Sequence, residues 1–213
     1  RGGGGGLGIV TDFEFRLHPV GTEVLAGSLA YPHEAAGGVL RRYRSFVEDA
    51  PREIRPLVGV MELPAASYYP ASLHGERVVL LLLCYCGDPA EGEAVLESLR
   101  SFGEPLLDSV RPRPYVAWQR AGESAEVART DLRSQYLPTL TDEAIEVVVE
   151  HAAAAPSAGA TAFVSPRGGA ECDPAPDATA FAHREPAHHV LVEARWSDPA
   201  RDDEHVGWVR AFH

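Results

Sequence analysis

The chain has 213 residues, of which 45% are hydrophobic, and this is enough for one large globular domain or for one domain with a further fragment. Its formal net charge is -12 and its Lys and Arg residues are scattered, so the phosphate backbone of a nucleic acid would be repelled. The longest apolar run, residues 78–86, is far shorter than the roughly 20 residues that span a bilayer. We therefore expect no nucleic-acid partner and no membrane-spanning segment.

The first residues and the cysteines indicate the cellular compartment of the protein. No charged segment followed by an apolar one marks a secretory signal, and three cysteines are too few for the disulfide framework of a small secreted protein. Cys84 and Cys86 stand two apart in an apolar run, and neighbours along one strand rarely have bridging geometry. We expect three reduced thiols and a cytoplasmic location.

The first quarter of the chain contains a glycine run and three predicted elements. The run at residues 2–8 disfavours a helix, because each Gly costs about 1 kcal/mol relative to Ala there. Residues 9–17 alternate apolar and polar side chains, which predicts a half-buried strand, and a second strand is predicted at 24–30. Residues 32–49 carry apolar side chains at helical spacing and predict a helix.

The rest of the chain continues with alternating strands and helices. In order, the patterns predict strands at 54–63 and 77–86, a helix at 88–102, a loop at 103–135, a helix at 141–155, a strand at 161–165, a loop at 165–177, a strand at 189–196 and a helix from 204 to 213. Asp88 and Thr141 are suitable N-cap residues for the two middle helices. The run 77–86 is apolar on both faces, which is typical of a central strand.

The order of these elements predicts the fold class. Strands that follow one another without an intervening helix pair in the antiparallel direction. We therefore expect an α+β fold, in which a mostly antiparallel sheet has its helices packed on one face.

The glycine run formally satisfies the pattern G-x-G-x-x-G over residues 3–8. That dinucleotide-binding fingerprint needs a strand before it and a helix after it, whereas a strand is predicted to follow here. From the residues alone, two interpretations stay open. The run is either a flexible linker or a loop whose backbone N–H groups approach a pyrophosphate closely.

Other arrangements of reactive residues are weaker. The candidate metal ligands are His183, His188 and His189 with Glu185 and Glu193. The consecutive strand residues His188 and His189 point to opposite faces, and we therefore expect no metal site. No G-x-S-x-G sequence positions a serine nucleophile, which disfavours a hydrolase. We identify no catalytic residue from the sequence.

Residues 2–20 closely resemble the end of the FAD-binding domain in the berberine bridge enzyme-like branch of the FAD-linked oxidases. In that family a glycine-rich run contacts the cofactor before the chain enters the substrate domain. Further segments resemble the family in the same order: residues 83–92, 141–145, 168–170, 178–184 and 196–199. Departures occur at Gly6 and Leu7, where the family usually has Asn and Phe, and at 133–135, which read Arg-Ser-Gln in place of Lys-Ser-His.

The resemblance implies a division of the chain and a set of site residues. Residues 1–20 would be a remnant of the FAD-binding domain, and residues 21–213 a substrate-binding domain truncated at its C-terminal end. The implied cofactor contacts are Gly4, Gly5, Gly8, Ile9 and Val10. The residues expected to line the substrate side are Arg133, Gln135, Gly168 and Gly169.

The resemblance also implies an activity for the intact parent protein. Such enzymes remove a hydride from a carbon bearing a hydroxyl or an amine, pass it to FAD and reoxidise the flavin with oxygen. The family's flavin-tethering His and its returning C-terminal segment lie outside this chain, so we expect FAD in the parent and not in this piece. The expected partner is a small-molecule substrate. The alternative is a non-catalytic binding or oligomerisation module, including a homodimer.

Overall fold

The computed structural model describes residues 2, 4–120, 128–181, 183–185 and 187–212. Within these residues the chain forms eight strands and five α-helices, joined in places by short 3-10 turns. In chain order the elements are β1 (Glu23–Pro32), α1 (Ala36–Asp49), β2 (Leu57–Glu62), β3 (Arg77–Tyr85), α2 (Pro89–Arg100), β4 (Leu107–Asp108), β5 (Arg111–Pro114), α3 (Tyr115–Arg120), β6 (Arg129–Leu137), α4 (Asp142–Ala153), β7 (Ala160–Arg167), β8 (Ala187–Trp196) and α5 (Asp202–Ala211).

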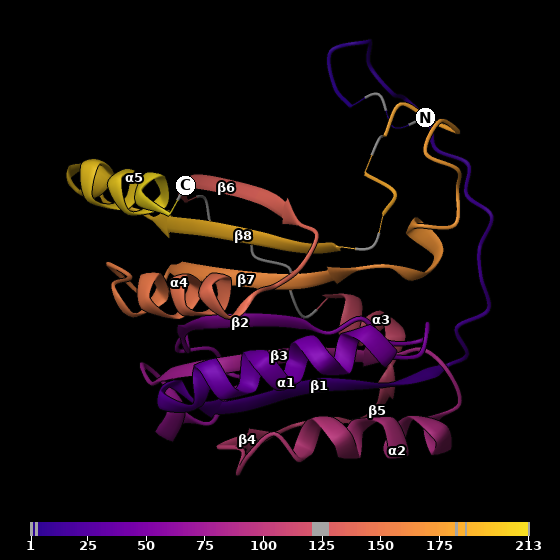
Figure 1. Cartoon of the computed structure of the whole chain (residues 1–213), viewed down its shortest axis with the longest axis horizontal. Coiled ribbons are helices and arrows are strands. Elements are labelled where there is room, and N and C mark those ends of the chain that lie inside the picture. The colour runs from indigo at the N-terminus through magenta and orange to yellow at the C-terminus, as the bar shows by residue number, and fades with distance from the viewer. Residues whose placement is uncertain (1, 3, 121–127, 182, 186, 213) are drawn as a thin grey trace.

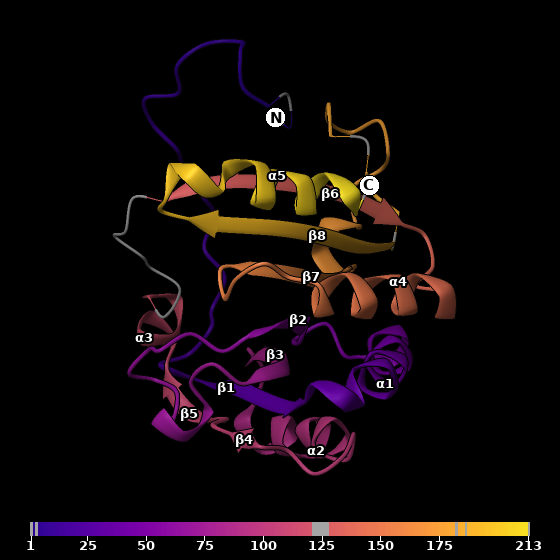
Figure 2. The ribbon, with the colours of Figure 1, turned by 90° about the vertical axis from the view of Figure 1, so that its left-hand side faces the viewer.

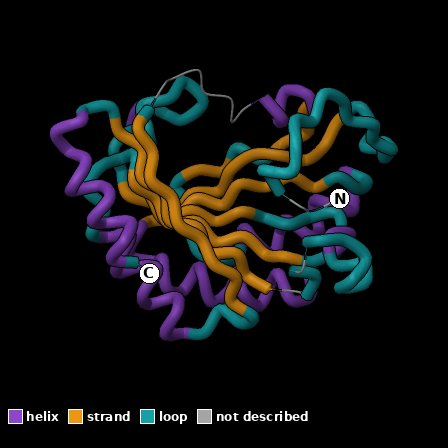
Figure 3. The backbone as a smooth tube through the Cα atoms, turned by 90° about the horizontal axis from the view of Figure 1, so that it is seen from above, coloured by secondary structure: helices purple, strands orange, loops and turns teal. Residues whose placement is uncertain are grey.

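All eight strands belong to one sheet, and each recorded pair is antiparallel (Figure 1). The strand order is β4-β1-β3-β2-β7-β8-β6, and β5 also pairs with β1. The helices α1, α2, α4 and α5 pack their apolar side chains against one face of this sheet (Figures 2 and 3). The predicted α+β fold with helices on one face is confirmed. We call the face opposite these four helices the open face.

The central strands are apolar on both sides because both sides are covered. On β3, Leu81 and Leu83 belong to the large core beneath the helices, whereas Val78 and Leu80 pack in a smaller cluster on the open face. The segment between β2 and β3 covers that smaller cluster through Tyr69. Burial of apolar area contributes about 25 cal/mol per Å², so packing on both faces makes these strands stabilising elements of the domain.

Helix starts follow the predicted capping residues. The carboxylate of Asp88 accepts a hydrogen bond from the N–H of Ala90 at 2.8 Å, and Pro89 is the first residue of α2. The hydroxyl of Thr141 accepts one from the N–H of Ala144 at 3.2 Å at the start of α4. Each cap satisfies an N–H group that lacks a partner within its own helix.

The predicted strand at residues 9–17 is wrong. The segment has an extended course without ladder pairing to the described part of the chain. Ile9 is 94% exposed and Leu17 85%, and Val10, on the alternate side, is exposed as well. A strand needs a neighbour for its N–H and C=O groups, and an alternating pattern alone does not supply one.

The predicted loop at 103–135 is also wrong over most of its described length, because it contains β4, β5, α3 and β6. β5 reads Arg-Pro-Arg-Pro and pairs only with β1, and an edge strand tolerates proline since one row of its N–H groups needs no partner. β6 is the other edge of the sheet, and its partly exposed, polar sequence hides the alternation on which strand prediction depends. Residues 121–127 lie outside the described residues.

Other boundaries shift by a few residues. Strand β2 begins at Leu57, and Ile54 makes only an isolated bridge to Tyr85. Strand β7 continues to Arg167, so the predicted loop at 165–177 begins later, and helix α5 starts at Asp202. None of the helices in the described ranges is long and apolar enough to cross a membrane.

Candidate functional site on the open face

Three strands bring polar and aromatic side chains together at one end of the open face. Tyr136 of β6 and Ser165 of β7 both stand opposite His189 of β8. Residues directly opposite in antiparallel strands project from the same face, and Arg167 shares that face because it lies two residues beyond Ser165. The sheet register therefore gathers Tyr136, Arg167 and His189, which are distant in sequence.

The loop between β7 and β8 adds further rings to this group. The ring centroid of Tyr136 lies 4.9 Å from that of His189 and 4.6 Å from that of His183, and Phe181 lies 5.6 Å from His183. The guanidinium of Arg184 stands 4.9 Å from the centroid of Phe181. We call this group the aromatic–arginine cluster, and its members are Tyr136, Arg167, Phe181, His183, Arg184 and His189.

Arg167 holds the cluster together, and only 9% of its side chain is exposed. Its guanidinium carbon lies 4.7 Å from the ring centroid of Tyr136 and 5.1 Å from that of Phe181. Its Nη2 donates a hydrogen bond to the carbonyl oxygen of His183 at 2.6 Å, and the Glu171 carboxylate is 3.6 Å away. Since a desolvated cation over an aromatic face adds about 2 kcal/mol, Arg167 fastens the loop to the strands.

His189 is a titratable member of the cluster, and its side chain projects from β8 on the open face. Burial and the positive charge of Arg167 lower its pKa, while the Glu171 carboxylate acts in the opposite direction. Because the ordinary pKa of His is already below 7, folded His189 is neutral at pH 7. A neutral imidazole has a free lone pair and can accept a proton.

A hollow of about 580 Å³ opens beside the cluster, which is the size of a site for a small organic molecule. Its lining includes Gln135, Tyr136, Arg167, His183, Arg184 and Glu185. Among the described residues, Nε of Arg167 and Nε of Arg184 are buried without a hydrogen-bond partner. The lining of the hollow thus combines the aromatic rings of Tyr136 and His183 with the side chains of Arg167 and Arg184.

The start of the chain reaches the same end of the molecule (Figure 1). A Cβ atom on Gly2 would lie 2.7 Å from the backbone nitrogen of Phe181 and 3.2 Å from Oγ1 of Thr179. Such a contact is too close for any residue with a side chain, and Gly2 also has a φ of 71°. The glycine run therefore comes against the loop that carries the cluster.

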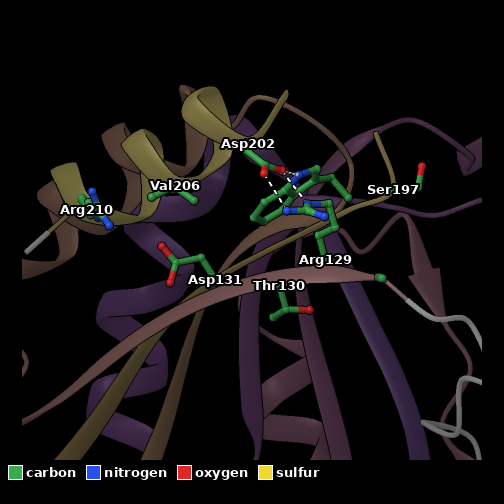
Figure 4. Close-up of a pocket in the computed structure, with 9 residues that line it drawn as sticks. Arg129, Thr130, Asp131, Ser197, Asp202, Val206 and Arg210 are labelled. Carbon is green, nitrogen blue, oxygen red and sulfur yellow. Dashed lines mark hydrogen bonds and ion pairs between the residues drawn. The ribbon is translucent and has the colours of Figure 1, made fainter. Parts of the chain in front are cut away.

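A second hollow, of about 670 Å³, lies between β6 and α5 (Figure 4). Asp202 accepts hydrogen bonds from Nε and Nη2 of Arg129, both at 2.6 Å, and from Nε1 of Trp196 at 2.7 Å. These donors, Arg129 first, lower the pKa of Asp202. The contacts fasten α5 to β6 and β8, and they account for Arg129 and Asp202 without a ligand.

Comparison with known proteins shows which proteins this chain resembles in sequence. No model of a protein family matches it. An FAD-linked oxidoreductase of Dictyostelium discoideum is 25% identical over 197 residues, which cover 90% of this chain and 40% of that protein. The chain is related to the FAD-linked oxidoreductases. An uncharacterized FAD-linked oxidoreductase of Bacillus subtilis is 23% identical over 215 residues, which cover 99% of this chain and 45% of that protein.

Solved structures of FAD oxidases share the fold. A berberine bridge enzyme-like protein of Physcomitrella patens has a TM-score of 0.74 at 16% identity, covering 93% of this chain and 44% of that one. Berberine bridge enzyme in complex with (S)-reticuline has a TM-score of 0.71 at 12% identity, covering 90% and 39%. The resemblance inferred from the sequence is confirmed, and the chain spans less than half the length of these FAD-linked relatives.

The residues expected to touch FAD have a suitable backbone. Of these residues, Gly4 and Gly8 have φ values of 66° and 154°, and Gly6, which lies between them, has one of 88°; a Cβ on any of the three would meet nothing within 4 Å. Repeated positive φ values can turn successive N–H groups toward an anion, as phosphate-binding loops do. The run therefore fits contact with the phosphates of FAD. Cofactor contact by Gly4, Gly5, Gly8, Ile9 and Val10 stays a prediction.

The predicted substrate-side residues lie in two arrangements. Arg133 and Gln135 stand opposite Val192 and Val190, so their side chains belong to the face that the helices cover. Gln135 nevertheless lines the hollow beside the cluster, whereas Arg133 lines neither that hollow nor the next one. Their role in binding substrate stays a prediction.

Gly168 and Gly169 lie just beyond β7, at the same end of the sheet. They line a neighbouring hollow of about 350 Å³, and a Cβ on Gly168 would lie 3.4 Å from Nε of Arg55. The two hollows share Pro138, Arg167 and Ala187. The structure thus brings Gln135 and the two glycines to one end of the sheet.

Sequence reasoning missed Tyr136, Arg167 and His189 as members of one site. The alternation over 189–196 was a usable signal, because it places His189 on the face opposite Val190. The pairing of β6 with β8 was not visible, since β6 was predicted as a loop. Among the described residues, no group of three or more His, Cys, Asp and Glu side chains is arranged to hold a metal ion.

Proposed function

We propose that this chain is the substrate-binding portion of an FAD-dependent oxidoreductase. The reaction is transfer of a hydride from an alcohol or amine carbon to flavin, with oxygen as the acceptor. In this proposal residues 1–20 are the end of the FAD-binding domain and residues 21–213 belong to the substrate-binding domain. The observation that carries it is the aromatic–arginine cluster on the open face, beside the hollow and against the glycine run.

Each group in the cluster has a part in the proposed reaction. Bound FAD would supply the hydride acceptor. The rings of Tyr136 and Phe181 give an apolar surface for the substrate, and Arg167 holds them in place. His189 is neutral and can take the proton that the hydroxyl or amine releases as its carbon is oxidised. These residues orient the substrate and remove its proton.

The related structures support a small-molecule substrate. One of them is an oxidoreductase of gilvocarcin biosynthesis in complex with pregilvocarcin, and it has a TM-score of 0.69 at 19% identity, covering 90% of this chain and 41% of that one. Another holds (S)-reticuline. We propose a small organic substrate of comparable kind, and neither a nucleic acid nor a membrane as partner. The cytoplasmic location stays a prediction.

The test is to purify the natural protein that contains these residues and assay it with panels of alcohols and amines. We expect a flavin absorbance spectrum and formation of hydrogen peroxide. His189→Gln should lower kcat by about 10²-fold or more with a smaller effect on KM, because a general base acts in the chemical step. His74→Gln, the same exchange in the loop between β2 and β3, should leave kcat unchanged. A natural protein without flavin, or equal kcat in both variants, would overturn the proposal.

The non-catalytic alternative has one observation in its favour. Apolar residues of the early segment are exposed, and they include Leu7, Ile9, Phe13, Phe15 and Leu17. Exposed apolar residues close together mark interaction surfaces. A natural protein that is dimeric and holds no flavin would favour a binding or oligomerisation module.

A further inference from the structure

Two thiols lie side by side where β3 ends. Sγ of Cys84 and Sγ of Cys86 are 3.6 Å apart, within hydrogen-bonding contact and without a covalent bond. β3 ends at Tyr85, and the N–H of Cys86 bonds to the carbonyl oxygen of Glu53 at 3.0 Å. Both side chains project to the same side because they are two residues apart.

The surroundings leave room for the two sulfurs to meet. Cys84 stands opposite Ala26 of β1, whose methyl group is small, and it lies on the open face with Leu82. Cys84 is half-buried and Cys86 is exposed. A disulfide needs a sulfur–sulfur distance of about 2.05 Å, so the gap must shorten by roughly 1.5 Å, which rotation of the side chains can supply.

Two arginines of β5 lie on the same face of the sheet as Cys84. Arg111 stands opposite Ala26 and Arg113 opposite Val24, so both project from the face that carries Cys84. They lie two strands away, or roughly 10 Å at the usual strand spacing. Burial, and then the carboxylates of Glu91, Glu53 and Asp88, raise the pKa of Tyr85, which stands between the two cysteines, so both signs of charge surround the thiols.

We propose that Cys84 and Cys86 form a dithiol site that reduces a low-molecular-weight disulfide and closes to an intramolecular disulfide. This inference does not involve flavin and is independent of the proposed function. The reagent class is a small disulfide that exchanges with thiols, and glutathione disulfide serves as the probe. The thiolate of Cys86 attacks one sulfur of the reagent, which forms a mixed disulfide and releases one thiolate. Cys84 then attacks Sγ of Cys86, which releases the second thiolate.

The balance of the reaction is two cysteine thiols and one disulfide giving one protein disulfide and two reagent thiols. The two protons from the cysteines go to the released thiolates, so the cysteines are oxidised and the reagent is reduced. Cys86 acts first because it is exposed. Burial and the neighbouring Cys86 raise the pKa of Cys84 to about 12. Once Cys86 is in the mixed disulfide it has no charge, and loss of the proton from Cys84 becomes easier.

The experiment exposes the reduced 213-residue chain to glutathione disulfide and follows it by intact mass and peptide mapping. We expect loss of two hydrogen atoms, a peptide that joins Cys84 to Cys86, and full reversal by dithiothreitol. Cys84→Ser should accumulate a stable glutathione adduct on Cys86, because no second thiol resolves it. Cys86→Ser should react with glutathione disulfide at least about tenfold more slowly than the unmodified chain, because only the half-buried thiol of Cys84 remains there.

Cys172→Ser is the matched control, since it removes the third free cysteine and should leave both products unchanged. A permanent glutathione adduct on the unmodified chain would overturn the proposal, as would a disulfide that involves Cys172 or a second molecule. Phenylarsine oxide, which binds paired thiols, gives an independent check that needs no substitution of Cys84 or Cys86. It should block the reaction of the chain and of Cys172→Ser, and failure to block either one would contradict the pairing.

Discussion

Gly159 and Gly207 show how differently two glycines act in one chain. Gly159 precedes β7, and its carbonyl oxygen accepts a hydrogen bond from the N–H of Arg195 at 2.9 Å. A Cβ there would lie 2.1 Å from the backbone oxygen of Arg195, which cannot move without breaking the β7–β8 ladder. Gly207 lies on the exposed side of α5, where a Cβ would meet nothing within 4 Å.

Alanine at these two positions should therefore change stability in opposite directions. Gly159→Ala should lower the free energy of unfolding by about 2 kcal/mol or more, because the backbone must separate to admit the methyl group. Gly207→Ala should raise it by about 1 kcal/mol, because alanine is the better helix former. Urea unfolding of the two variants beside the parent chain measures both effects. A neutral Gly159→Ala would show that the β7–β8 contact is looser than described.

At the scale of elements, α5 is fastened to the sheet edge by charge as well as by packing. Trp208 and Val209 bury its apolar side, while Asp202 at its first turn accepts hydrogen bonds from Arg129 and Trp196 (Figure 4). An acidic residue in the first turn also interacts favourably with the helix dipole. The contact joins α5 and β6. The sequence predicted the helix and did not predict the strand.

This contact predicts a pH dependence of stability. The pKa of Asp202 is lowered in the folded chain, by Arg129 first and then by Trp196. Its stabilising contribution is therefore fully present above the ordinary carboxyl pKa of about 3.9 and is lost as the pH falls through the lower folded value. Asp202→Asn should lower Tm at pH 7 and flatten the fall of Tm in acid. Asp203→Asn makes the same change of charge one residue later and should retain the steep fall.

At the scale of the whole molecule, the early segment and the sheet behave as separate parts. Residues 4–19 are exposed, and among the described contacts it is Gly2 that comes against the loop at Phe181. β1 is almost entirely buried between β3 on one side and β4 and β5 on the other. The stability of the domain should therefore begin with β1 and owe little to what precedes it.

Truncation tests this separation, and with it the proposed boundary at residue 21. A chain of residues 21–213 should keep the Tm of the full chain to within a few degrees, because little apolar area is withdrawn from the core. A chain that starts at residue 33 also lacks β1 and should fail to fold. Thermal melts followed by circular dichroism distinguish the outcomes. A large loss of Tm in the first truncation would mean that residues 1–20 pack on the domain.

The helices and strands that the sequence predicts correctly are those whose side chains are well buried or whose ends are capped. The strands at 24–30 and 77–86 and the helices that begin near Asp88 and Thr141 were predicted, because buried strands and capped helices leave local patterns. β6 was not predicted, because an edge strand exposes much of both faces and keeps polar residues on each. The prediction for residues 9–17 failed in the opposite way. The pattern there alternates like that of a strand, but the segment pairs with no strand among the described residues.

The sequence by itself determined the fold class, the direction of strand pairing and the relationship to FAD-linked oxidoreductases. These depend on local periodicity and on short motifs, which a single chain displays in order. The tertiary structure alone decided that Tyr136, Arg167 and His189 share one face, and that the glycine run comes against Phe181. Such contacts depend on sheet register and loop course, which long-range packing determines, so no local pattern records them.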